Sequence, residues 1–444
     1  MAGRPKPLNP ARVMAIGFMG FILSGSALLS LPPMIEGANI AYIDALFTAA
    51  SAVCVTGLVV VDTGTFYTPL GQTVIMVLIF CGSLGFMTMT TLVFVFLGRK
   101  ITLRDRLLVK EALNQDSVGG LVRLVLVVVR IAVFFILLGT IIISIRSIPQ
   151  LGFGRGLFFA LFHAVSAFGN AGFDIIGNYD SLSRLPTDYL VNGTVMILFI
   201  IGGLGFTVLL EIIRRLKFKA RISLHSRLVL LTSAVLLVGG TLIILLLEYN
   251  NPATMGNLSA GGKLFTALFT AATPRTAGFN VLSTAALTYP TVLILIALMF
   301  IGASPTSTGG GIKTTTFGIV FFTFINMIRG KQEPVVFSRH FSLNQIMKAV
   351  SIICAAIGLI FLSTFVLTIF EDKEFSALMF ESFSAFGTVG LSRGITPDLS
   401  TPGKITLIVT MFGGRIGPLT LLVALSKQKK VDVLHYPEEH ILIG

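Results

Sequence analysis

Long uncharged stretches are the feature of this sequence that most constrains its fold. Six stretches contain no charged residue, at 13–35, 63–98, 189–210, 228–247, 276–312 and 349–370. Two more, at 121–145 and 405–426, are interrupted by Arg130 and Arg415 respectively, the first of them also having Arg123 near its start. Because a helix needs about 20 apolar residues to cross a bilayer, we expect eight full transmembrane helices.

A buried core helix is the alternative interpretation of any one such stretch. The chain has 444 residues, of which 54% are hydrophobic and only 12% are charged, and its mean hydropathy is +0.91. Soluble domains carry about 25% charged residues, so too few charges remain to surround eight buried helices with a water-facing shell. The composition therefore favours an all-α polytopic membrane protein.

The positions of lysine and arginine predict how the chain is oriented. Most of the 33 basic residues lie near the two termini or in connections at 99–110, 214–227 and 329–348, all on one side of the alternating path. Because such loops stay in the cytoplasm, we place this side there, together with the termini at 1–11 and 428–444. The net charge of +13 is thus a topology signal and gives little support to nucleic-acid binding. More than half of the 20 acidic residues fall on the opposite face, where they would concentrate cations.

Side chains that would indicate a bound metal or an enzyme are sparse. The three cysteines, Cys54, Cys81 and Cys354, lie in apolar stretches and predict neither a disulfide framework nor a metal site. The five histidines are scattered, and the sequence contains no evident cluster of carboxylates or nucleophile with a base. We therefore expect no covalently bound cofactor and no enzymatic activity.

A short pattern recurs four times in the connections of the acidic face. Each copy opens on a phenylalanine and closes on a glycine nine or ten residues later; the pairs are Phe47 and Gly57, Phe162 and Gly172, Phe269 and Gly278, and Phe380 and Gly390. Since one span precedes each copy and one follows it, the chain reads as four tandem repeats of span, half-helix, glycine loop and span. The repeats cover 12–98, 119–215, 225–328 and 343–427. A chance capping glycine would explain one match, but not four in register.

The four loops predict an ion pathway. The segments before the glycines, of about eleven residues, can enter a membrane but cannot cross it, and irregular backbone at that depth must be buried in protein or line a cavity. Glycine lets successive carbonyls turn toward a common axis, and a ring of such oxygens can replace the hydration shell of K⁺. The half-helices would aim their negative C-terminal ends at that ion. The predicted filter residues are Val55, Thr56, Gly57, Asn170, Ala171, Gly172, Thr276, Ala277, Gly278, Thr388, Val389 and Gly390.

The second span of the third repeat contains a break. It reads Gly302, Ala303, Ser304, Pro305, Thr306, Ser307, Thr308, Gly309, Gly310 and Gly311, with Lys313 close behind. Proline and three consecutive glycines cannot hold a continuous helix. One interpretation is a kink that only aids packing; the small and hydroxylated residues favour a loop that lines the pore below the filter.

Arg415 is the second unusual feature of this region. The other three repeats place Ser83, Gly203 and Ala303 at its position. A charge so near the membrane centre is costly, and no acid lies in its own span or in the broken one. A structural ion pair is therefore a poor explanation of Arg415. Arg130 remains without an assigned role.

The four loops and their order resemble the superfamily of K⁺ transporters that includes Trk, Ktr and plant HKT proteins. The bacterial Ktr membrane subunit is the most similar member, over residues 12–444, with further matching segments at 62–65, 111–115 and 273–280. In this family a serine in the first loop accompanies sodium permeation, so Gly57 implies selectivity for potassium. The resemblance also implies that 302–312 is an intramembrane gate, which Arg415 holds closed through hydrogen bonds to its carbonyls.

The same resemblance implies the setting in which the protein works. It predicts a multi-pass protein of the bacterial cell membrane that takes up K⁺, with Na⁺ as a required or activating ion. It also predicts a homodimer above a cytosolic ring of RCK-type subunits, with nucleotide bound on the ring and not on this chain. A sodium-coupled secondary carrier of K⁺ with alternating access is the alternative, although such carriers typically have inverted repeats and these repeats are parallel. The residues leave passive and coupled transport open.

Overall fold

The computed structural model describes residues 10–37, 39–85, 88–89, 91–92, 121–184, 186, 188–331 and 334–425. The predictions for the C-terminal tail at 428–444, most of the N-terminal segment at 1–11 and the basic connection at 99–110 fall outside these residues, as does the segment at 111–115. Within the described part of the chain the regular structure is almost entirely helical. One small antiparallel hairpin pairs β1 (Val335–Val336) with β2 (Arg339–His340).

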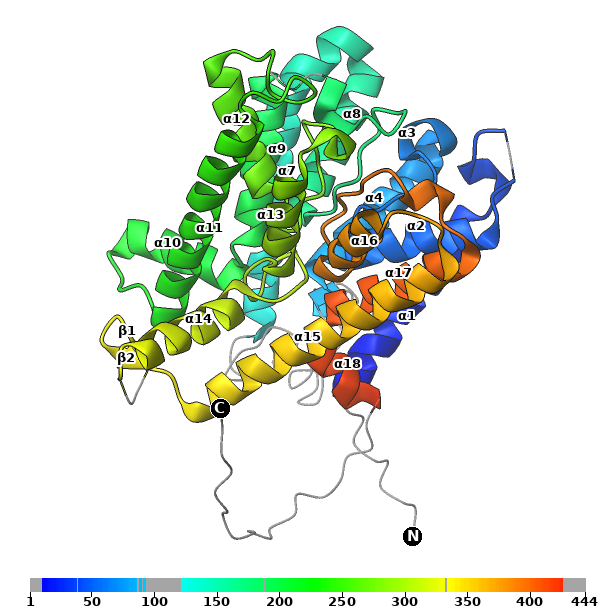
Figure 1. The fold of residues 1–444 in the computed structure, drawn as a ribbon. Helices are drawn as coiled ribbons and strands as arrows, with labels where there is room; N and C mark the ends of the chain where they lie inside the picture. The colour runs from blue at the N-terminus through cyan, green and yellow to red at the C-terminus, as the bar shows by residue number, and fades with distance from the viewer. Residues whose placement is uncertain are drawn as a thin grey trace, which may run out of the picture.

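The helices follow one another in a repeating order of long, short and broken elements (Figure 1). In chain order they are α1 (Pro10–Leu29), α2 (Tyr42–Cys54), α3 (Thr63–Phe66), α4 (Pro69–Leu84), α7 (Leu121–Leu151), α8 (Phe153–Gly169), α9 (Tyr189–Gly203), α10 (Phe206–Phe218), α11 (Leu224–Glu248), α12 (Ala260–Ala272), α13 (Tyr289–Phe300), α14 (Thr314–Ile328), α15 (Leu343–Phe370), α16 (Phe375–Gly387), α17 (Thr401–Ile416) and α18 (Pro418–Leu425). Short 3₁₀ turns lie at Pro32–Met34, Ser181–Arg184, Thr284–Ala286 and Thr396–Asp398.

Among the described residues, four helices are long and apolar enough to cross a membrane unaided. They are the first helix of each predicted repeat, with spanning portions Ala11–Leu29, Val122–Leu151, Leu224–Glu248 and Leu343–Phe370. The pair α9 and α10 would make a fifth span, although its two parts are bent by 99°. The protein is therefore an all-α membrane protein with several apolar spans and a bent helix pair.

The second span is interrupted in every repeat, whereas the sequence analysis expected a break in the third alone. The helices α4 and α17 are followed directly by Gly85 and Gly417, with φ values of 81° and 95° and ψ values of 148° and 133°. In the second repeat α9 ends at Gly203, and Gly205, with φ 92° and ψ 136°, directly precedes α10. Side chains other than hydrogen strongly disfavour this backbone region. The recurring G-x-x-G pattern thus includes a backbone break that periodicity alone does not reveal.

The first glycine of that pattern has a packing role. A Cβ atom on Gly82, Gly202 or Gly414 would overlap a backbone carbonyl oxygen near the end of the short helix of the same repeat. Those oxygens belong to Val53, Phe168 and Phe386. The second spans therefore press directly against the short helices because these positions carry no side chain.

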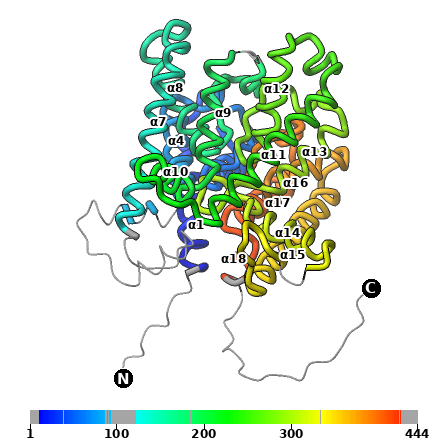
Figure 2. The backbone as a smooth tube through the Cα atoms, turned by 90° about the vertical axis from the view of Figure 1, so that its left-hand side faces the viewer, coloured from blue at the N-terminus to red at the C-terminus, as the bar shows by residue number. Residues whose placement is uncertain are grey.

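The four repeats pack in a closed cycle (Figures 1 and 2). The second span of each repeat contacts the short helix of the next: α4 contacts α8, α9 contacts α12, α13 contacts α16, and α17 returns to α2. An ion pair of 2.6 Å between Lys404 and Asp44 joins the last repeat to the first. The phenylalanine that opens each copy of the pattern is fully or almost fully buried: Phe47, Phe162, Phe269 and Phe380. This arrangement brings the four loops that follow the short helices to the middle of the molecule.

Candidate functional site

The four predicted glycines form a ring, which we call the glycine ring. All four have positive φ: 92° at Gly57, 69° at Gly172, 77° at Gly278 and 93° at Gly390. A Cβ placed on Gly57 would lie 3.1 Å from the Cα of Gly172, and one on Gly172 would lie 2.8 Å from the Cα of Gly278. A Cβ on Gly278 would lie 3.4 Å from the Cα of Gly390, and one on Gly390 would lie 3.0 Å from the Cα of Gly57.

Backbone carbonyls of the loops lie between these glycines. A Cβ on Gly57 would overlap the carbonyl oxygen of Ala171, and one on Gly390 would overlap that of Thr56. The carbonyl oxygen of Val389 lies in the same way against Gly278. Within the ring there is consequently no room for a side chain at these positions, and the groups nearest the centre are backbone atoms.

Three of the four short helices are followed by a left-handed residue that turns the chain into the loop. Val55, Asn170 and Thr388 take this conformation directly after α2, α8 and α16, with φ between 50° and 59°. The third repeat differs because its loop is one residue shorter: Thr273 after α12 stays right-handed, and Thr276 carries the positive φ of 70°. A left-handed cap satisfies the last carbonyls of a helix.

A hydroxyl side chain near the end of each short helix supports the loop that follows, and the sequence analysis missed it. The hydroxyls of Ser51 and Ser384 each accept a 3.1 Å hydrogen bond from the backbone N–H of the ring glycine six residues later. Those of Ser166 and Thr273 each donate a 2.6 Å bond to the carbonyl after the glycine. An alignment of the four copies on their glycines, with one gap in the third, would have revealed this position.

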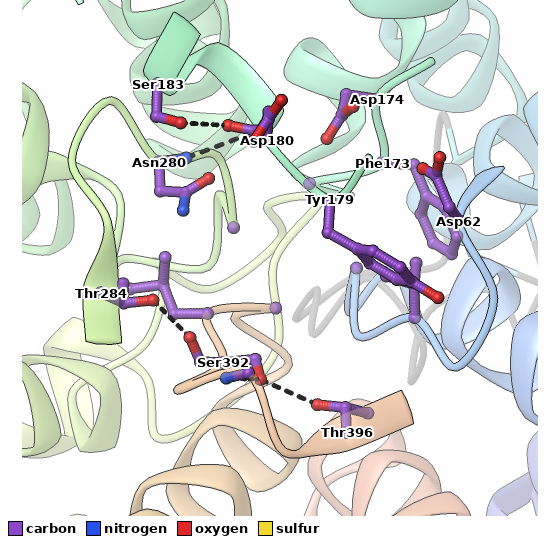
Figure 3. A pocket seen from close by; sticks show the side chains of 18 of the residues that line it. Asp62, Phe173, Asp174, Tyr179, Asp180, Ser183, Asn280, Thr284, Ser392 and Thr396 are labelled. Atoms are coloured by element: carbon purple, nitrogen blue, oxygen red, sulfur yellow. Dashed lines mark hydrogen bonds between the residues drawn. The ribbon is translucent and has the colours of Figure 1, made fainter. Parts of the chain in front are cut away.

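One side of the glycine ring opens into a cavity of about 370 Å³, which we call the first cavity. Its lining includes all four ring glycines and the side chains of Asp62, Asp174 and Asp180, drawn from the segments that follow the first two loops (Figure 3). Arg393 also lines it, but its guanidinium donates 2.7 Å to Ser376 and lies 3.8 Å from Glu374. Three aspartates against one engaged arginine make this cavity favourable for cations.

Asp174 is the carboxylate of this lining whose pKa is raised. Burial raises the pKa of its carboxyl from 3.8 to about 6, and the nearby Asp62 and Asp180 act in the same direction. A 3.1 Å hydrogen bond from the N–H of Ile176 opposes the rise in pKa. The charge at the mouth of the ring therefore changes within an accessible pH range.

The opposite side of the ring is covered by the 302–312 segment. The hydroxyl of Thr308 donates 2.8 Å to Oδ1 of Asn170, and the N–H of Gly310 donates 3.1 Å to the hydroxyl of Thr388. A Cβ on Gly309 would collide with the hydroxyl of Thr276. Three of the four predicted filter loops thus touch this segment directly, and its glycines allow the contact.

Arg415 holds the same segment from the side. One of its N–H groups donates to the carbonyl of Thr308 and another to the carbonyl of Gly82, with Ser83 O at 3.4 Å. The contact between Arg415 and a carbonyl of the segment was expected; the contact with the first repeat was not. Lys313 donates 2.7 Å to Gly309 O and 3.3 Å to Gly310 O.

Beyond the segment lies a second cavity of about 210 Å³. Its lining includes Ser83, Thr306, Ser307, Lys313 and Arg415. The 302–312 segment and the two cations therefore stand between the two cavities. Arg130, by contrast, is exposed on α7 and takes no part in this arrangement.

The fold and the site together define an α-helical membrane protein in which four backbone loops separate two polar cavities. The chain matches the family model described as TrkH, cation transport protein, over residues 14–434. It is 46% identical to Ktr system potassium uptake protein B of Bacillus subtilis, over 98% of this chain and 97% of that protein. It is 37% identical to potassium/sodium uptake protein NtpJ of Enterococcus hirae, over 99% and 98% of the two chains.

The crystal structure of the potassium transporter TrkH from Vibrio parahaemolyticus has the same fold, with a TM-score of 0.75 at 17% identity over 95% of this chain and 86% of that one. The chain belongs to the TrkH cation transport family. It is accordingly a multi-pass transport protein and not an enzyme.

Proposed function

We propose that this protein takes up potassium selectively through a pore whose filter is the glycine ring. The observation that carries the proposal is the cycle of four positive-φ glycines with carbonyls of neighbouring loops between them. Carbonyl rings of this kind replace the hydration shell of K⁺. The names of the Bacillus subtilis and Enterococcus hirae relatives point to the same ion, and the second also to sodium.

Each of the four repeats would contribute one loop to this pore. Each broken second span would count as a single crossing, which gives the eight predicted crossings. The acidic first cavity would face the outside and concentrate cations before the ring. This orientation agrees with the basic connections at 214–227 and 329–348 on the opposite side. In a bacterium the membrane concerned would be the cell membrane.

The 302–312 segment would act as the gate of this pore. It lies against the side of the ring away from the first cavity, and Arg415 and Lys313 place positive charge there. A cation leaving the ring would meet both the segment and this charge. Movement of the segment would therefore be needed for conduction.

Potassium selectivity and sodium dependence are tested together in liposomes with opposed K⁺ and Na⁺ gradients. A reversal potential near the potassium equilibrium value supports a selective pore, and sodium on the outer side alone should raise the flux. A sodium-coupled carrier would instead have a reversal potential that depends on both ion gradients in a proportion fixed by its coupling stoichiometry. Equal permeability to the two ions would refute the proposed filter.

The partners follow from the same proposal. We expect a homodimer that docks a cytosolic ring of RCK-type subunits, in keeping with the name of the relative as one component of a Ktr system. The β1–β2 hairpin offers a docking surface, because Phe337, Arg339 and His340 are exposed on it. Light scattering in mild detergent measures the dimer. Flux with and without the ring, in ATP and then in ADP, measures regulation, and identical flux in all conditions would refute it.

A further inference from the structure

Helix α10 leaves the transmembrane bundle almost at a right angle. It is bent by 99° from α9 at Gly205 and lies beside α11 (Figures 1 and 2). Glu211 on α10 accepts hydrogen bonds of 3.0 and 2.9 Å from the N–H and hydroxyl of Ser223, the N-cap of α11. The 25 residues of α11 span about 37 Å, more than the roughly 30 Å of a bilayer core. Its first turn, and α10 with it, therefore lies at a membrane boundary.

That boundary is the one opposite the first cavity. At the other end of α11, Glu248 accepts 2.8 Å from the hydroxyl of Thr288 and 2.7 Å from Asn251. Asn251 in turn donates 3.2 Å to the carbonyl of Ala286, next to residues that line the first cavity. The Ser223 end of α11 consequently lies at the membrane boundary opposite the first cavity.

The last turns of α10 combine basic and apolar side chains that are both exposed. Leu216 and Phe218, which precede and follow Lys217 in the sequence, are 80% and 76% exposed. Arg214, Arg215 and Lys217 are exposed as well, and none of them forms an ion pair with an acid within the described residues. Such a mixture suits the level of lipid headgroups, where apolar groups enter the acyl region and cations meet phosphate.

The first residues of α10 hold the 302–312 segment. The N–H of Phe206 donates 3.1 Å to the carbonyl of Thr306, and the hydroxyls of Thr207 and Thr306 lie 3.0 Å apart. A Cβ on Gly205 would overlap the carbonyl oxygen of Pro305. One short helix thus connects the exposed basic turn to the segment that covers the glycine ring.

We propose that Arg214, Arg215 and Lys217 bind anionic lipid headgroups of the membrane leaflet on this side, and that this binding draws α10 away from Thr306 and favours opening. The second half rests on the proposed gate; the first half does not. Lipid fits better than an acidic protein surface because α10 lies at the boundary itself and presents Leu216 and Phe218 between the charges. Each basic residue near an anionic surface contributes about a fivefold factor in association.

The absence of tryptophan from the sequence allows a direct test of binding. In a Phe218→Trp variant the introduced indole is the only one, and its quenching by spin-labelled phosphatidylglycerol is compared with quenching by spin-labelled phosphatidylcholine. We expect half-quenching at an anionic fraction at least about fivefold lower. Adding Arg214→Gln, Arg215→Gln and Lys217→Gln should remove this preference, whereas Arg329→Gln, Lys331→Gln and Lys348→Gln should keep it. Equal quenching by both lipids would overturn the proposal. So would quenching that falls when the cytosolic ring is added but not when the three basic residues are replaced.

The effect on opening is measured as K⁺ flux in vesicles of phosphatidylcholine with and without phosphatidylglycerol. Flux should rise severalfold with the anionic lipid, and the triple variant should lose the rise while its reversal potential stays that of the parent. An unchanged flux with retained quenching preference would overturn the link to the gate. An absence of K⁺ flux in every lipid would count against the proposed function instead and leave the binding result standing.

Discussion

The hydroxyl of Thr308 donates a 2.8 Å hydrogen bond to the side-chain oxygen of Asn170, and both residues are fully buried. Asn170 caps the second short helix in a left-handed conformation, and Thr308 lies in the segment that covers the ring. The bond therefore joins the proposed filter to the proposed gate. A neutral buried hydrogen bond contributes about 1 kcal/mol, which is enough to alter the open fraction severalfold.

The first prediction is that this bond couples the two elements. Thr308→Val should raise K⁺ flux severalfold because the segment loses a contact with the filter. Asn170→Gly removes the same bond while keeping a residue suited to positive φ. Since both changes break one interaction, the double variant should resemble either single variant. Flux of the four proteins in liposomes checks this, and additive effects would show that the two residues act independently.

The second prediction concerns selectivity. Gly57→Ser places a side chain at φ 92° against the carbonyl of Ala171, so it must displace an oxygen of the ring. The variant should admit sodium, seen as a reversal potential shifted toward that of a non-selective pore. Gly37→Ser is the matched control, because Gly37 has φ 81° with no atom within 4 Å of its Cβ position. Sodium exclusion equal to that of the parent would remove this loop from the filter.

The third prediction concerns Arg415. Its guanidinium bridges the carbonyls of Thr308 and Gly82, and hydrogen bonds from a charged group contribute about 1.5–3 kcal/mol. Arg415→Ala should therefore raise K⁺ flux by about tenfold with little change in selectivity, and shortening Thr306–Gly311 should act in the same direction. Arg130→Ala, on the exposed face of α7, is the control. Parental flux at normal protein abundance would favour a packing role for the break.

Several of these features could be predicted from the sequence because they repeat. The four phenylalanine–glycine copies placed the short helices and the ring glycines, and Pro305 with Gly309–Gly311 marked the irregular segment. The half-helices are longer than the expected eleven residues, at 13 to 17, because helix starts lie in polar connections with weak signals.

Other features depend on packing in three dimensions. The breaks at Gly85 and Gly205 lie in uncharged, hydrophobic sequence that looks continuous, and only their backbone angles show them. The break at Gly417 lies between Arg415 and Pro418. The partner carbonyls of Arg415 come from two other repeats, 107 and 333 residues away. Backbone acceptors carry no side-chain signature, so no pattern of residues could have identified the carbonyl of Gly82.

The last prediction concerns pH and Asp174. Its carboxyl has a pKa raised from 3.8 to about 6, chiefly by burial, so it is charged at pH 7.5 and largely neutral at pH 5. Acidifying the side of the first cavity should remove one negative charge near the ring and weaken apparent K⁺ affinity about twofold at low salt. Asp174→Asn should show the weaker affinity at both pH values and lose this part of the pH profile. Asp372→Asn, which removes an exposed charge outside the cavity lining, should keep it.

The pH dependence of the stability of the folded protein tests the raised pKa of Asp174 independently. Because the folded pKa lies above the unfolded one, the charged carboxylate destabilises the folded protein above pH 6, and the penalty disappears as pH falls below about 3.8. Asp174→Asn should therefore raise the thermal midpoint in detergent at pH 7.5, and the gain should shrink steadily as the pH is lowered toward 4. A gain that did not change with pH would mean that the substitution acts through packing, and the pH dependence of affinity would then require another titrating group.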